Sequence, residues 1–160
     1  MKRRNGETVK GRPRFPDSPA LRFISHSTSI LHTHTVRVRY AETDQAGMAH
    51  HSAFLPWFEE GRVALLRSLG KPYQEFEAEG LHFPVRGAFC RYWGPARFDD
   101  VLTVATVIEE VGGASVRFHY RITRASDAAL IAEGYTLHAC VDDGGRVKRL
   151  PLEVRKLLSP

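Results

Sequence analysis

Alternating apolar and polar positions predict a first strand over residues 33–40. Val36, Val38 and Tyr40 fall on one face of this segment and arginines on the other, as in a strand with one buried side. The polar stretch AETDQAG that follows must leave the sheet and turn, because it combines glycine with short polar side chains. Asp44 therefore sits on a connection and not in the core.

Residues 51–70 have the apolar spacing of a helix, and Gly70 supplies a C-terminal stop. We expect this helix to begin near His51, with Ser52 as its N-cap. Aromatic residues crowd its first turns, so most of the helix should be buried, and a helix this apolar needs a sheet wrapped around it. Its apolar positions are Phe54, Trp57, Phe58, Gly61, Leu65 and Leu69.

Four strand-like runs follow, separated by turn signals built from glycine, proline, serine and aspartate. One strand, a long apolar helix and four consecutive strands suited to hairpins together predict an α+β domain. The four runs cover residues 82–93, 101–111, 115–123 and 130–142, with short helical patches expected at 73–78 and 151–158.

Charge divides the chain into a tail and a domain. Residues 1–30 hold seven Lys or Arg against two acidic residues and have no apolar period, so we expect a disordered basic tail. Residues 31–160 then form one domain with sixteen charges of each sign, which gives no reason to expect a nucleic-acid face. No apolar stretch is long enough to span a membrane or to form a secretory signal, so we expect a cytoplasmic protein.

The run VRYAETDQAGMAHHSAFLPWFEEGR resembles the signature of the 4-hydroxybenzoyl-CoA thioesterase-like hotdog proteins, including their Tol-Pal-associated acyl-CoA thioesterase branch. The shared pattern is an aromatic residue, an acid-Thr-Asp triplet, a glycine three residues on, a histidine four later and a glutamate eight beyond. These positions are Tyr40, Glu42, Thr43, Asp44, Gly47, His51 and Glu59. Some relatives carry tyrosine before the matched histidine, where this chain has His50, so that role is not transferred.

The resemblance covers about residues 33–158 and implies a hotdog fold, in which a curved antiparallel sheet wraps around one long central helix. It also implies homodimers or homotetramers with sites at the dimer seam. The reaction it implies is hydrolysis of a short-chain or aromatic acyl-CoA to free acid and CoA, with Asp44 as nucleophile or general base.

The chemistry of thioester hydrolysis favours the same residues as catalytic groups. Hydrolysis needs a nucleophile or base and a donor that stabilises the developing oxyanion. Asp44 supplies the first, and the helix start near His51 points backbone N–H groups at the same region. A lone aspartate in a glycine-containing loop is usually a turn residue, and it is the surrounding motif that favours catalysis. Both His51 and Glu59, two helical turns further on, could act in the site or be structural.

Candidate substrate contacts complete the hypothesis. The candidates for binding substrate are Tyr40, Thr43, Gly47, Phe54 and Trp57, and the arginines that could meet CoA phosphates are Arg91, Arg97, Arg117, Arg121 and Arg124. For Arg117 and Arg121 the default interpretation is that they lie on the solvated face of a strand.

No metal is expected, because the histidines lack partners at ligand spacing, and Cys90 and Cys140 suggest buried thiols. No cofactor is expected beyond the CoA of the substrate. Two alternatives stay open: a hotdog hydratase or dehydratase of acyl thioesters, and a non-catalytic module that binds acyl-CoA or acyl carrier protein.

Overall fold

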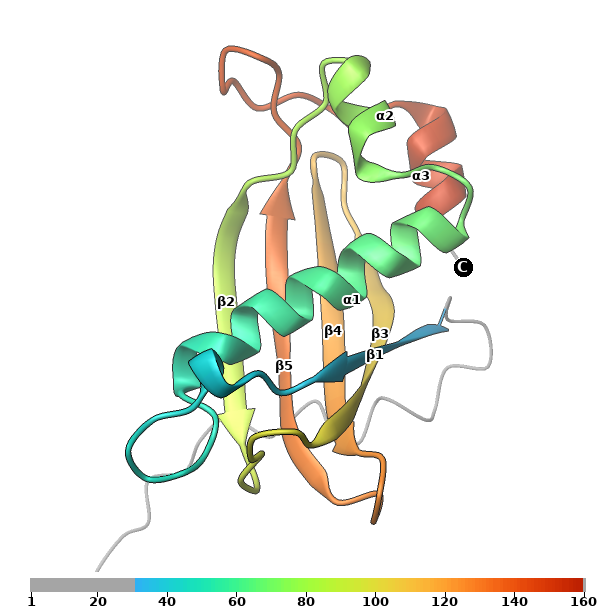
Figure 1. Cartoon of the computed structure of the whole chain (residues 1–160). Coiled ribbons are helices and arrows are strands. Elements are labelled where there is room, and N and C mark those ends of the chain that lie inside the picture. The colour runs from blue at the N-terminus through green and yellow to red at the C-terminus, as the bar shows by residue number, and fades with distance from the viewer. Residues whose placement is uncertain (1–30, 160) are drawn as a thin grey trace, which may run out of the picture.

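The structure is a computed structural model that describes residues 31–159. Within that range five antiparallel strands form one sheet in the order β1-β3-β4-β5-β2, and α1 lies across one of its faces (Figure 1). The strands are β1 (Leu31–Arg37), β2 (Val85–Tyr92), β3 (Val101–Val111), β4 (Ser115–Arg124) and β5 (Leu130–Ala139). The helices are α1 (Phe54–Ser68), α2 (Tyr73–Ala78) and α3 (Leu152–Leu158). The predicted α+β hotdog architecture is confirmed, whereas the expected disorder of residues 1–30 lies outside the described range.

The core lies between α1 and the concave face of the sheet. Phe58 stacks on Tyr120 of β4 with ring centroids 4.3 Å apart, and both side chains are fully buried. Burying one such side chain contributes about 1.5–3 kcal/mol. Gly134 of β5 makes room for this pair, because a Cβ there would meet the Phe58 ring and the carbonyl oxygen of Phe89.

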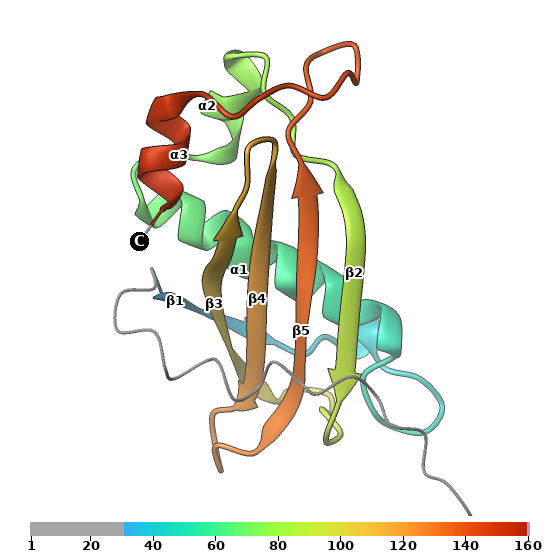
Figure 2. The same cartoon turned by 180° about the vertical axis from the view of Figure 1, so that it is seen from behind.

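The opposite face of the sheet carries none of the three helices of residues 31–159, as Figure 2 shows from behind. Helices α2 and α3 lie together beyond one end of the sheet in both views. The connection from β1 to α1 and the connection from β2 to β3 lie at the other end.

The first strand is shorter than predicted. Val36 and Val38 are buried as expected, but β1 ends at Arg37 and Tyr40 is 77% exposed. The placement of Tyr40 on the buried face is therefore wrong. A 3-10 turn over Tyr40–Glu42 replaces the strand, because the Glu42 carboxylate accepts hydrogen bonds from the backbone N–H and the guanidinium of Arg39.

Helix α1 begins later than predicted. A 3-10 turn over His51–Ala53 comes first, and the regular helix starts at Phe54. The N-cap of the 3-10 turn is His50, whose Nδ1 accepts from the Ser52 N–H at 3.3 Å, so the prediction of Ser52 as the cap is wrong. Pro56 falls in the first turn of α1, where its missing N–H costs no helical hydrogen bond.

The remaining boundaries differ by a few residues. Strand β2 begins at Val85 instead of residue 82, and β5 ends at Ala139 instead of residue 142. His82 and Val141 still pair, as an isolated bridge beyond both strand ends. Beyond the strand ends, pairing between these two segments is reduced to this one bridge.

Candidate active site

The candidate catalytic loop is folded around a turn from Asp44 to Gly47. The Gly47 N–H donates to the Asp44 carbonyl at 3.0 Å, and the Asp44 N–H donates to the Met48 carbonyl at 3.0 Å. Gly47 has a φ of +71°, the left-handed region that favours glycine. One carboxylate oxygen of Asp44 accepts from the Ala46 N–H at 2.8 Å, so the turn orients the carboxylate.

Thr43 and Glu42 join this loop to its surroundings. The Thr43 hydroxyl donates to the Tyr40 carbonyl at 2.7 Å, and Thr43 forms a bridge with Ala49 that closes the loop. The Glu42 carboxylate accepts from the indole N–H of Trp57 at 3.2 Å, which fastens the loop to α1. Burial acts to raise the pKa of Glu42, but the hydrogen bonds from Arg39 and Trp57 outweigh it and hold that pKa below its usual range.

A cavity of about 450 Å³ opens beside the turn. It is formed by the catalytic loop, the start of α1 and the segment that follows β2. Its lining residues are Asp44, Met48, Ala49, His51, Phe54, Tyr92, Trp93, Gly94, Pro95 and Ala96. The structure therefore brings together three of the predicted site residues: Asp44, His51 and Phe54.

Tyr92 and Trp93 line this cavity although the sequence interpretation did not select them. The Tyr92 ring packs edge-on against Phe54 with centroids 4.8 Å apart, and its hydroxyl donates to the His51 carbonyl at 3.4 Å. Burial, and then the neighbouring Cys90, raise the pKa of Tyr92 to about 12, so the phenol stays neutral. Both residues end a predicted strand just before Gly94-Pro95, but only the sheet register shows that this end faces the catalytic loop.

The 3-10 turn that precedes α1 belongs to the cavity wall through His51. The Ser52 N–H is used by His50 Nδ1, and the Ala53 N–H is used by the His50 carbonyl. Among residues 31–159 no acceptor faces the His51 N–H, which precedes the helical ladder. A bound carbonyl oxygen could accept from this N–H.

Other predicted site residues lie elsewhere. Glu59 lines a second cavity of about 330 Å³ between α1 and β2 and is not brought to Asp44 within one chain. Trp57 is 1% exposed and lies beneath the loop instead of in the cavity wall. Tyr40 packs edge-on against Phe98 with centroids 5.6 Å apart, while Thr43 and Gly47 belong to the loop but are not among the residues that line the cavity.

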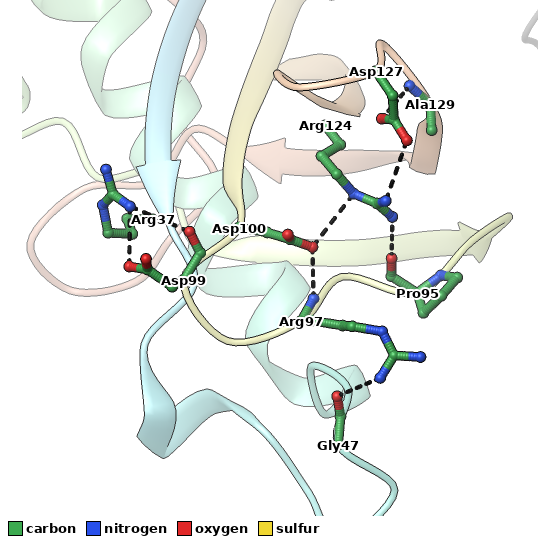
Figure 3. Close-up of polar contacts among 9 residues, drawn as sticks. All are labelled: Arg37, Gly47, Pro95, Arg97, Asp99, Asp100, Arg124, Asp127 and Ala129. Atoms are coloured by element: carbon green, nitrogen blue, oxygen red, sulfur yellow. Dashed lines mark hydrogen bonds and ion pairs between the residues drawn. The ribbon is translucent and has the colours of Figure 1, made fainter.

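The loop between β2 and β3 is fastened to the catalytic loop, as Figure 3 shows. The Arg97 guanidinium donates to the Gly47 carbonyl at 3.1 Å, and the Arg97 N–H donates to Asp100 at 2.8 Å. Arg124 of β4 pairs with Asp100 at 3.3 Å and donates to the Pro95 carbonyl at 2.6 Å. Arg124 is therefore engaged with protein partners, whereas Arg97 stays exposed with one guanidinium nitrogen bound to the Gly47 carbonyl.

Two other candidate arginines face the outer side of the sheet. Arg117 lies over the Tyr135 ring at 4.3 Å and within 3.8 Å of Glu109. Arg121 lies 3.5 Å from Glu133. These contacts agree with the reading of Arg117 and Arg121 as a strand face.

Two observations concern possible metal ligands and thiols in the described part of the chain. No group of three or more histidine, cysteine, aspartate or glutamate side chains there could hold a metal ion. Burial raises the pKa of the Cys90 thiol to about 11, which leaves it a poor nucleophile at neutral pH. No helix within residues 31–159 is long and apolar enough to cross a membrane.

Comparison with known proteins identifies the family. Residues 38–158 match the model of the thioesterase-like superfamily. The acyl-CoA thioester hydrolase YbgC of Escherichia coli is 36% identical over 107 residues, which cover 67% of this chain and 79% of YbgC.

Solved structures agree. A hypothetical protein from Thermus thermophilus superposes with a TM-score of 0.75 at 39% identity, covering 79% of this chain and 96% of its own. A 1,4-dihydroxy-2-naphthoyl-CoA thioesterase from Synechocystis superposes with a TM-score of 0.73 at 25% identity, covering 80% and 95%. The chain therefore belongs to the thioesterase-like superfamily of hotdog-fold proteins.

Proposed function

We propose that this protein is an acyl-CoA thioesterase that hydrolyses a short-chain or aromatic acyl-CoA to free acid and CoA. The observation that carries the proposal is that the Asp44 carboxylate and the start of α1 line the same cavity. Relatives named as acyl-CoA thioester hydrolases, such as YbgC, support the substrate class.

Asp44 acts as nucleophile or general base. One of its carboxylate oxygens is tied to the Ala46 N–H, which leaves the other to attack the thioester carbonyl or to deprotonate a water. The His51 N–H donates to the oxygen that gains negative charge as the carbonyl carbon becomes tetrahedral. Loss of a single donor of this kind costs about 100-fold or more in rate.

The apolar wall of the cavity holds the thioester near these groups. Phe54, Tyr92 and Trp93 contribute aromatic surface at its sides. Aromatic side chains bind apolar groups well and keep their shape, because few of their torsions rotate. The sulfur leaves as the CoA thiolate, a good leaving group that needs no metal.

We propose a homodimer, or a homotetramer built from two such dimers, as the active form. Strand β2 is the last in the sheet order, so its outer edge has no partner strand among residues 31–159. Val85, Phe89 and Tyr92 along it are large apolar side chains that remain exposed. Such an edge favours pairing with a second copy. Glu59, which lines a separate cavity, would act in catalysis only through this assembly.

Light scattering of the purified protein tests the assembly. The expected result is a dimer or a tetramer that Phe89→Glu weakens, because a charge would enter the paired edge. A monomer at all concentrations would refute both the proposed assembly and the proposed catalytic role of Glu59.

The reaction is tested by thiol release from a panel of short-chain and aromatic acyl-CoAs and from an acyl carrier protein thioester, followed with a disulfide dye. We expect Asp44→Asn to lose at least about 100-fold in kcat with an unchanged melting temperature. Asp143→Asn is the matched control, because Asp143 is an exposed aspartate on a distant turn.

Other results of this assay would favour a different catalytic residue or a different function. Undiminished turnover by Asp44→Asn would show that Asp44 is not the catalytic group. Binding of acyl-CoA without thiol release would favour the non-catalytic module, and hydration of an enoyl-CoA without thiol release would favour the hydratase. Cell fractionation tests the proposed cytoplasmic location.

A further inference from the structure

We propose that Arg97 is a positioning residue that sets the orientation of the Asp44 carboxylate through the Gly47 carbonyl. The inference rests on the proposed function, in which Asp44 performs the chemistry. Arg97 is not among the residues that line the cavity, so its effect passes through the turn.

The contact to Gly47 controls the turn directly. Gly47 closes the turn through its N–H bond to the Asp44 carbonyl, and its own carbonyl accepts from Arg97 at 3.1 Å. Two residues further on, the Ala49 N–H donates to the Ala96 carbonyl at 2.7 Å. Residues 96–97 therefore hold the catalytic loop at two points, one on each side of Met48.

The support under Arg97 is itself fixed. Asp100 accepts from the Arg97 N–H and pairs with Arg124, and a second nitrogen of Arg124 donates to the Pro95 carbonyl. A third contact joins Arg124 to Asp127 at 3.3 Å. The Arg124 and Asp100 side chains are about three-quarters buried, so water competes little for these bonds. Figure 3 shows this path from β4 through the loop to Gly47.

A strained residue marks the same loop. Asp99 has a φ of +69°, which is rare for a residue other than glycine. Arg37 of β1 holds it by donating to both its carbonyl, at 3.2 Å, and its carboxylate, at 3.0 Å. Such a conformation persists because its surroundings impose it. The sheet thus holds the loop from β1 and from β4, and within residues 31–159 the Arg97 side chain is the one from this loop that hydrogen-bonds to the catalytic turn.

Removal of Arg97 should therefore affect turnover more than binding. Attack on a carbonyl needs the reacting atoms about 3–3.5 Å apart and aligned, and a misplacement of about 1 Å can cost about 100-fold. With Gly47 released, the Asp44 carboxylate samples other directions while the walls of the cavity remain in place. We expect kcat to fall about 10- to 100-fold, with KM changing less than about 3-fold.

The experiment compares Arg97→Met, Arg97→Lys and Asp44→Asn with the wild type. Each is assayed with an acyl-CoA and with the same acyl group on N-acetylcysteamine, which lacks the phosphates. Arg155→Met on α3 is the matched control, because Arg155 is an exposed arginine remote from the loop. Arg97→Met should lose kcat equally on both substrates, and Arg97→Lys should recover part of it, since an ammonium group can donate to the Gly47 carbonyl.

Hydrogen exchange of the peptide that spans residues 42–50 adds a readout independent of activity. We expect faster exchange there in Arg97→Met and exchange at the wild-type rate in Arg155→Met. Unchanged kcat in Arg97→Met, or unchanged exchange, would overturn the inference.

Two further outcomes are distinct. A rise in KM confined to the acyl-CoA substrate would make Arg97 a phosphate contact and overturn the positioning role. Loss of activity in Arg97→Met with full activity in Asp44→Asn would instead refute Asp44 as the catalytic group.

Discussion

Replacement of Gly61 by alanine should destabilise the protein, although alanine is the better helix former. In a solvent-exposed helix the change would gain about 0.5–1 kcal/mol. Here α1 lies so close to β3 that a Cβ at Gly61 would come within 2.5 Å of Thr106 Oγ1 and 2.8 Å of Val104 Cγ1. Both neighbours are 0% exposed and have no open space to move into.

The cost of overpacking exceeds the gain in helix propensity. One extra carbon in a well-packed core costs about 1–3 kcal/mol, so the net loss should be about 1–2 kcal/mol. For a domain of this size that lowers the melting temperature by about 4–8 °C. The assay is thermal and urea unfolding of wild type and Gly61→Ala. Gly113→Ala is the matched control, because a Cβ there meets nothing within 4 Å.

A double variant identifies the contact responsible. Thr106 Oγ1 is buried and has no hydrogen-bond partner among residues 31–159, so Thr106→Ala removes the closest obstacle without leaving a polar group unpaired. Gly61→Ala should cost less in the Thr106→Ala background than in the wild type. A melting temperature raised by Gly61→Ala alone would refute the close packing of α1 on β3.

Two further predictions concern hydrogen bonds among buried residues that line the second cavity. Burial lowers the pKa of His138 from 6.5 to about 4. The unfolded chain therefore binds this proton at higher pH than the folded protein does. The free energy of unfolding should fall as the pH drops from 6.5 towards 4, by about 2 kcal/mol at pH 5. Urea titrations of wild type and His138→Gln check this, and equal pH slopes in the two proteins would contradict it. Because the Phe83 carbonyl can only accept from His138 Nδ1, Nε2 accepts from Thr136, and Thr136 in turn accepts from Tyr120 at 2.6 Å. Tyr120→Phe should then lower the free energy of unfolding by about 1 kcal/mol and Thr136→Val by about 2–3 kcal/mol, since only the second leaves buried groups unpaired at both ends. Equal losses in urea unfolding would show that these hydrogen bonds do not run in this direction.

The fold could be predicted because local pattern and tertiary packing agree over most of the chain. Alternation in the segment that became β4 reflects one face against α1, and the apolar helix needed a sheet to cover it. Where a single side chain redirects the backbone, the pattern fails. Tyr40 continues the alternation of β1, yet the Glu42 carboxylate turns the chain before it.

The site could be predicted only in its local part. Asp44, His51 and Phe54 are close in sequence, and one turn of chain brings them to one cavity. Glu59 stands eight residues beyond His51, and a helix rises about 1.5 Å per residue, so it lies about 12 Å further along. Tyr92 belongs to a strand about forty positions later, and its place depends on the register of β2 with β5.

The position of β2 connects the proposed assembly to the proposed chemistry. One end of this strand supplies Tyr92 to the cavity wall, and its outer edge, like that of β1, has no partner strand among residues 31–159. Pairing of that edge with a second copy would order the strand along its whole length, including the hydroxyl that contacts the His51 carbonyl. Loss of the partner would free the end of β2 and with it one wall of the cavity. Activity per chain should therefore depend on assembly even if every group that touches the thioester comes from one chain.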